Sequence, residues 1–155
     1  YSAGRAATTG RTGAVFNLQP PGCRGSALSS AGETAGVVPF TIDLTSCTPG
    51  ADVSVYFEKD QYVSTEGRLK NTLSDGTEAE NVDVELLNTR FTPINLAETP
   101  AVAADGTIAR PDVIPVAVAE QDGSASLPFY ARYYATDAAT AGKVATYVNF
   151  TVVYP

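Results

Sequence analysis

The chain has 155 residues, a net charge of −7 and 44% hydrophobic residues. This length and composition predict one globular domain that buries a core of its own. The acidic excess argues against nucleic acid as a partner, because phosphate binding requires a basic surface. No apolar run approaches the length that spans a bilayer, so we expect no membrane insertion.

The absent residue types narrow the range of functions. The chain contains no His, Met or Trp and only two Cys. Because His is the commonest general acid–base group and metal ligand, Ser–His, Cys–His and His-based zinc sites are excluded. The carboxylate pairs Glu78/Glu80 and Asp83/Glu85 could serve a glycosidase, but their i, i+2 spacing is more typical of a solvated face. We expect neither an enzyme nor a cofactor.

Most of the chain alternates between short apolar–polar runs and turn residues. Residues 1–13 are small and polar, as in a flexible arm, and residues 14–18 predict a short strand before Pro20 and Pro21. Period-two alternation predicts further strands at 38–47, 53–57 and 82–86. Residues 67–72 predict a short strand or edge ribbon, and residues 91–96 predict a strand in which Pro93 indicates an edge or an irregular start. Residues 97–123 predict a long excursion with one strand at 113–118 and a hairpin-type turn at Asp122-Gly123. No window shows convincing helical periodicity.

Two longer alternating runs end the chain, at 127–135 and from Val144 onward, and we expect them to form a hairpin. The final run places two sets of side chains on opposite faces. One face carries Val144, Thr146, Val148, Phe150, Val152 and Tyr154. An apolar terminal strand with no partner would promote aggregation, so we expect a partner strand beside it.

Cys23 and Cys47 enclose a segment of 23 residues. In a secreted chain such a pair predicts one disulfide, whose loop closure stabilises the fold by about 3 kcal/mol. Two free, buried thiols are the alternative. A disulfide would indicate an oxidising compartment.

Seven or so short strands separated by turns predict an all-β, immunoglobulin-like sandwich. The buried Trp of antibody domains is absent, and the two Cys lie near the start of the chain. The chain is therefore not an antibody-type domain.

Several motifs together resemble the pilin subunits of chaperone–usher fimbriae. Tyr154 is penultimate, Gly142 stands fourteenth from the end, and an alternating apolar strand lies between them. The run AGVVPFTIDLTSC at 35–47 is similar to the family's second strand with its second cysteine, and LPFYARYYA at 127–135 is similar to its last hairpin. The resemblance covers roughly residues 26–155.

The resemblance implies an incomplete immunoglobulin-like β-sandwich, the pilin fold, completed by a donor strand from a neighbouring subunit. Residues 14–155 would be the pilin domain and residues 1–13 an N-terminal extension. A periplasmic chaperone strand would first fill the open groove, and the next subunit's extension would replace it by β-augmentation. Such head-to-tail contacts propagate into a helical polymer of identical subunits.

The resemblance also assigns residues to this assembly. Groove and chaperone-interface residues would be Gly142, Val144, Val148, Phe150, Val152 and Tyr154, with Phe40, Ile42 and Leu44 facing the groove from the second strand. Candidate donor residues are Tyr1, Ala3, Ala7, Phe16 and Leu18. The partners implied are identical subunits, a periplasmic chaperone, an outer-membrane usher and a host receptor, and the location is an extracellular fimbrium. The alternative function is a monomeric or minor adhesive subunit that binds a host glycan.

Overall fold

The computed structural model describes residues 6–18, 28, 31–98, 116–119 and 121–154, with the backbone alone for 6–12, 14–18, 116, 153 and 154. Every regular element in these ranges is a strand. The strands are β1 (Ala6–Leu18), β2 (Thr34–Leu44), β3 (Asp52–Phe57), β4 (Leu69–Lys70), β5 (Val82–Leu87), β6 (Val116–Ala117), β7 (Ala125–Ala135) and β8 (Gly142–Tyr154). None of the described segments is a helix of the length and apolarity that crossing a bilayer requires.

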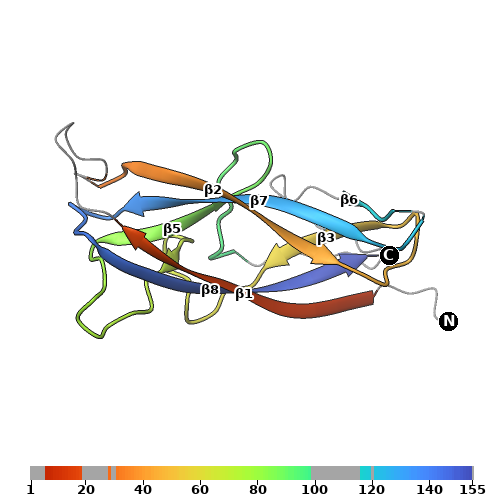
Figure 1. Ribbon diagram of the computed structural model, residues 1–155, viewed down its shortest axis with the longest axis horizontal. Helices are drawn as coiled ribbons and strands as arrows, with labels where there is room; N and C mark the ends of the chain where they lie inside the picture. Colours follow the sequence, from red (N-terminus) through yellow and green to blue (C-terminus); the bar gives the residue numbers. More distant parts are fainter. Residues whose placement is uncertain (1–5, 19–27, 29–30, 99–115, 120, 155) are drawn as a thin grey trace.

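The strands form two four-stranded sheets, ordered β1-β8-β3-β6 and β2-β7-β5-β4. Within each sheet the paired strands are antiparallel. The two sheets run along the long axis of the molecule as separate layers (Figure 1). The predicted all-β sandwich is confirmed.

The core lies between the layers and follows from the alternation of the strands. One side of each long strand carries apolar residues, and burying a large one stabilises the fold by about 1.5–3 kcal/mol. The largest side chains with no appreciable exposure are Phe57, Leu87, Leu96, Leu127, Val53, Val144 and Val152. The sheets are joined where Phe57 packs edge-on against Phe129, with ring centroids 5.0 Å apart.

The expected strand at 91–96 is wrong. After β5 the chain enters a tight turn in which Asn88 Oδ1 accepts hydrogen bonds from the backbone N–H groups of Arg90 and Thr92, at 2.9 and 3.1 Å. Phe91 has a φ of +61°, which no strand residue adopts. Pro93 then makes only an isolated bridge to Leu87, since its nitrogen carries no proton to donate.

The expected hairpin between the last two strands is also wrong. β7 pairs with β2 and β5, whereas β8 pairs with β1 and β3, so the connection at 136–141 crosses from one sheet to the other. The turn at Asp122-Gly123 likewise links β6 and β7, which belong to different sheets. The apolar faces of β7 and β8 therefore meet across the core from opposite layers.

β1 is longer than the sequence predicts. The sequence indicates an arm up to residue 13 and a strand only from Ala14, but one strand spans Ala6–Leu18. Pairing with β8 explains the difference. The small, polar residues of 6–13 have little preference for a strand, but the ladder with β8 satisfies their backbone hydrogen bonds and holds them extended. The division between extension and domain at residue 13 stays a prediction.

Candidate functional site

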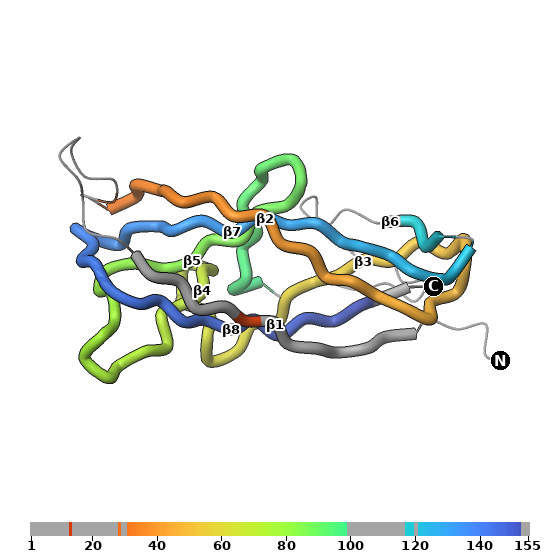
Figure 2. Tube along the Cα trace, viewed as in Figure 1, coloured from red at the N-terminus to blue at the C-terminus, as the bar shows by residue number. Residues whose placement is uncertain are grey.

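β8 is the strand around which the candidate site is built. On one side it pairs with β3, over Ser54↔Val153 to Phe57↔Phe150. On the other it pairs with the edge strand β1 along its whole length, from Ala6↔Tyr154 to Leu18↔Gly142. The ribbons of β1 and β8 run side by side in Figure 1, and Figure 2 traces β8 and β3 from the same viewpoint. The described chain therefore places its own N-terminal strand against β8.

Gly142 begins β8 at a point of close backbone contact. Its φ is +154°, and a Cβ there would lie 2.6 Å from Ala79 N and 2.7 Å from the carbonyl carbon of Glu78. Two backbone hydrogen bonds of 2.9 Å hold this crossing, from Lys143 N to Thr77 O and from Ala79 N to Lys143 O. A side chain at position 142 would force these segments apart, which explains the glycine that the sequence singles out.

The inward side of β8 is largely buried. Val144, Val148 and Val152 belong to the core, and Phe150 packs partly buried against it. The side chain of Tyr154 lies outside the described part of the chain. Of the second-strand residues, Ile42 is buried, while Phe40 and Leu44 are half-buried against the core.

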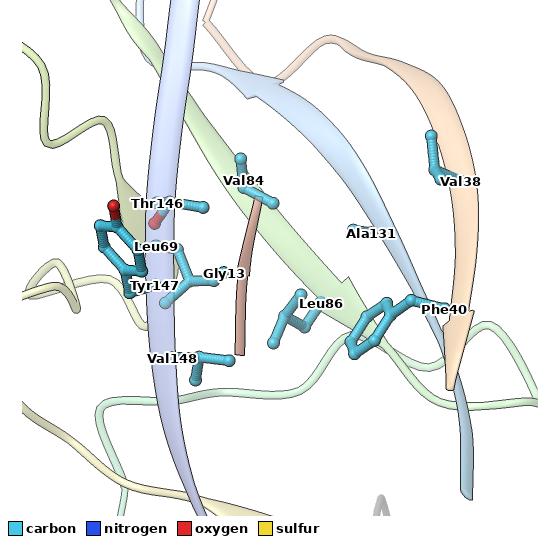
Figure 3. Close-up of a pocket in the computed structure, with 10 residues that line it drawn as sticks. All are labelled: Gly13, Val38, Phe40, Leu69, Val84, Leu86, Ala131, Thr146, Tyr147 and Val148. Atoms are coloured by element: carbon cyan, nitrogen blue, oxygen red, sulfur yellow. The ribbon is translucent and has the colours of Figure 1, made fainter. Parts of the chain in front are cut away.

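An apolar cavity of about 160 Å³ lies between the two layers, beside β8 (Figure 3). It is lined by Gly13, Val38, Phe40, Leu69, Val84, Leu86, Ala131, Thr146, Tyr147 and Val148. An apolar void of this size accommodates a group as large as a benzene ring. The site thus has room for one bulky apolar side chain.

The sequence predicted only part of this lining. Phe40 and Val148 line the cavity, but the other predicted groove residues do not. β5 contributes Val84 and Leu86, and β7 contributes Ala131. Their alternation with polar neighbours marks them as inward-facing, but only the pairing of β7 with both β2 and β5 brings them to this place.

The candidate donor residues fall on or before β1. Tyr1 and Ala3 lie outside the described residues. Ala7 pairs with Val153, Phe16 with Val144 and Leu18 with Gly142.

The β1 residues that pair with the cavity-lining part of β8 are smaller than Phe16 and Leu18. Thr12 pairs with Val148 and Ala14 with Thr146, with Gly13 between them. These three residue types bring little volume to the part of β8 that lines the cavity.

Thr146 adds a polar feature to this lining. Its side chain is buried, and its Oγ1 has no hydrogen-bond partner, the one such side-chain atom among the residues described. A buried hydroxyl without a partner destabilises a fold by about 1–3 kcal/mol.

The predicted disulfide involves Cys23, which lies outside the described residues. Cys47 is half-buried just after β2, and its thiol donates to the Thr45 carbonyl oxygen at 3.7 Å. The Cys23–Cys47 bond stays a prediction.

The carboxylate pair on β5 is engaged by arginines. Asp83 lies 3.2 Å from Arg68 Nε, and Glu85 lies 2.6 Å from an Arg132 guanidinium nitrogen. Burial raises the pKa of Asp83, although the hydrogen bond and charge of Arg68 oppose that rise. Within the described ranges, no three His, Cys, Asp or Glu residues gather as a metal site would require.

The tyrosines of β7 and β8 mostly pack against neighbours. Tyr130 meets the ring of Phe91 at 4.9 Å, and Tyr134 lies beneath the guanidinium of Arg68 at 3.9 Å. Burial raises the pKa of the Tyr133 hydroxyl. Tyr147 is the most exposed of the four, at 38%.

Comparison with known proteins identifies the family. The family model for Type-1 fimbrial protein, A matches residues 20–155, most of the chain. The chain belongs to the type-1 fimbrial protein family. The resemblance drawn from Gly142, Tyr154 and the strand between them is confirmed, and the matched region begins after β1.

Individual fimbrial proteins agree with this membership. The chain is 39% identical over 143 residues to the major fimbrial subunit SMF-1 of Stenotrophomonas maltophilia strain K279a, covering 92% of this chain and 80% of that protein. It is 36% identical over 146 residues to the F17 fimbrial protein of Escherichia coli, covering 90% and 74%. A crystal structure of a Burkholderia pseudomallei antigen and type I fimbria protein matches 97% of this chain and 99% of its own, with a TM-score of 0.54 and 23% identity, which supports the fold.

Proposed function

We propose that this chain is a structural subunit of a chaperone–usher fimbria and polymerises head to tail by donor-strand exchange. The observation that carries the proposal is the antiparallel pairing of β1 with all 13 residues of β8. An edge strand joined to the sheet through one such ladder can be replaced by an equivalent strand of another chain, since the main-chain bonds are the same. In the fibre, β1 of the next subunit would then lie against β8 of this one.

The cavity supports a preceding chaperone step. A chaperone strand that pairs with β8 and carries one bulky apolar residue opposite Val148 would place that residue at this space. Because the cavity is partly open to solvent, filling it would contribute less than the roughly 4 kcal/mol expected for an enclosed cavity of about 160 Å³, at about 24 cal/mol per Å³. This energy would hold the subunit on the chaperone until an usher delivers the next subunit. The finished fibre would stand on the cell surface and meet a host receptor.

The proposal includes no catalytic role. The β5 carboxylates are paired with Arg68 and Arg132, which suits a structural face better than acid–base chemistry. Family membership as a fimbrial protein points the same way.

Cysteine cross-linking tests strand exchange. One preparation carries Ala7→Cys and a second, with a different tag, carries Val153→Cys, because these positions pair in register. We expect a disulfide between chains of the two preparations when they assemble together, with a ladder on non-reducing gels and fibres by electron microscopy. Each variant alone is the control.

A third chain carrying both substitutions separates exchange from self-pairing. If it cross-links within itself and the mixed preparations yield only uncross-linked monomers, the proposal is wrong. The chain would then be a self-complemented monomer.

A further inference from the structure

We propose that Tyr147 sets the register of the strand that pairs with β8, by packing its ring across a residue that must lack a Cβ. In the structure this residue is Gly13, which pairs directly with Tyr147. A Cβ at Gly13 would overlap Tyr147 Cδ1 and lie 2.8 Å from Tyr147 Cε1 and 2.9 Å from the carbonyl oxygen of Thr146. The ring therefore occupies the space that any other residue would need.

The Tyr147 ring packs against the ring of Tyr62. The ring of Tyr62 lies 5.4 Å away at an angle of 53°, a tilted aromatic contact. The backbone of Tyr62 is itself fixed, since its N–H donates to Asp60 Oδ1 at 2.9 Å and its carbonyl accepts from Lys70 N at 2.8 Å. Asn149, two residues along β8 from Tyr147, donates to Asp60 and ties this turn to the strand. Moving the Tyr147 ring away from β1 would press it against a Tyr62 side chain whose backbone is held in place.

The rest of β1 specifies its register weakly. Its sequence AATTGRTGAVFNL is rich in small residues and contains two glycines, and strands of this kind are prone to slippage. A shift by one residue turns every side chain to the other face, so only shifts by two preserve the pattern. Such a shift would place Arg11 or Val15 opposite Tyr147, and both carry a Cβ. A large aromatic residue across from an edge-strand glycine is a recognised register-fixing device.

This inference deepens the proposed function. A donor strand from a neighbouring subunit would meet the same ring on β8. Tyr147 would then accept a strand only with glycine at this position, which makes it a specificity-determining residue for subunit assembly.

A double-mutant cycle in the full chain tests the contact. We expect Gly13→Ala to lower the folding equilibrium constant roughly tenfold or more, as overpacking does, and to lower the urea midpoint accordingly. In a Tyr147→Ala chain the same substitution should produce a clearly smaller loss, because only the 2.9 Å approach to the Thr146 carbonyl oxygen remains. Gly10→Ala is the matched control, because Gly10 pairs with Phe150 and its effect should not depend on Tyr147. Equal losses from Gly13→Ala in both backgrounds would overturn the proposal.

A glycine transplant tests the register itself. The exchange Arg11→Gly with Gly13→Arg keeps the composition of β1 and moves the glycine by two residues. We expect Ala7→Cys to cross-link with Val153→Cys in the original sequence and with Thr151→Cys in the transplant, as a two-residue shift requires. Continued cross-linking to position 153, or equal cross-linking to both positions, would show that Tyr147 does not set the register.

These outcomes are distinct from those of the proposed function. Both tests use pairing within one chain, so the Tyr147 contact can hold even if no cross-links form between subunits. Conversely, cross-links between subunits together with no coupling between positions 13 and 147 in the double-mutant cycle would support the proposed function. The same pair of results would refute the role of Tyr147 in specificity.

Discussion

Replacing Gly142 by Ala is expected to destabilise the chain by about 2–6 kcal/mol. The new Cβ would lie 2.6 Å from Ala79 N and 2.8 Å from Glu78 O, so these backbone atoms would have to move by roughly an ångström to reach van der Waals distance. Overpacking of this kind costs about 1–3 kcal/mol. The φ of +154° adds about 1–3 kcal/mol of backbone strain for a residue with a side chain.

Urea and thermal unfolding of the full chain measure this effect, with Gly76→Ala as the matched control. Gly76 also has a positive φ, +94°, but no atom lies within 4 Å of its would-be Cβ. Gly76→Ala should therefore cost only the conformational part, about 1–2 kcal/mol. A loss of about 3 kcal/mol lowers the melting temperature by about 6–12 °C in a chain of this size. If Gly142→Ala costs no more than Gly76→Ala, the steric argument is refuted.

Three further predictions follow from other contacts. Asn88→Ala should cost about 2 kcal/mol in thermal unfolding, because the buried amide oxygen accepts two backbone hydrogen bonds in its turn. Asp83→Asn should gain stability relative to the unsubstituted chain as the pH of urea unfolding rises from about 3 to 7. Burial raises the pKa of Asp83 in the folded chain despite Arg68, so Asp83 adds to the free energy of unfolding below its unfolded pKa. This contribution is lost as the pH rises through the folded pKa, whereas Asn at this position does not titrate. Replacing Cys23 and Cys47 by Ser should cost about 3 kcal/mol, and the unsubstituted chain, denatured without reductant, should show no reactive thiol.

Each of these predictions has a control or a contrary outcome. Asn95→Ala removes an exposed side chain that accepts a hydrogen bond from Ala97 N, and should cost less than Asn88→Ala, because Asn88 is buried. A relative loss for Asp83→Asn at neutral pH would show that the Arg68 ion pair outweighs burial. Two titratable thiols in the denatured, unreduced chain would contradict the disulfide.

The fold class and the importance of the C-terminal strand follow from local patterns in the amino-acid sequence. Period-two alternation in β3, β5, β7 and β8 is a local property, because successive side chains of any strand point to opposite faces. Gly142 and the penultimate Tyr154 likewise stand at fixed distances from the chain end, so the family resemblance needs no coordinates.

The tertiary structure decided which strands are neighbours. Alternation does not reveal whether β8 continues the sheet of β7 or crosses to the other layer, since both arrangements bury the same apolar faces. The cavity depends on that choice, because Leu69, Val84, Leu86 and Ala131 reach it only through the pairings of β4, β5 and β7.

The contact between Gly13 and Tyr147 shows the same limit most clearly. In the sequence, Gly13 is one glycine among 13 and Tyr147 one tyrosine among eight. Neither residue is distinguished by its local pattern. Their relation exists only because an antiparallel ladder brings together two strands that lie more than a hundred residues apart in the chain.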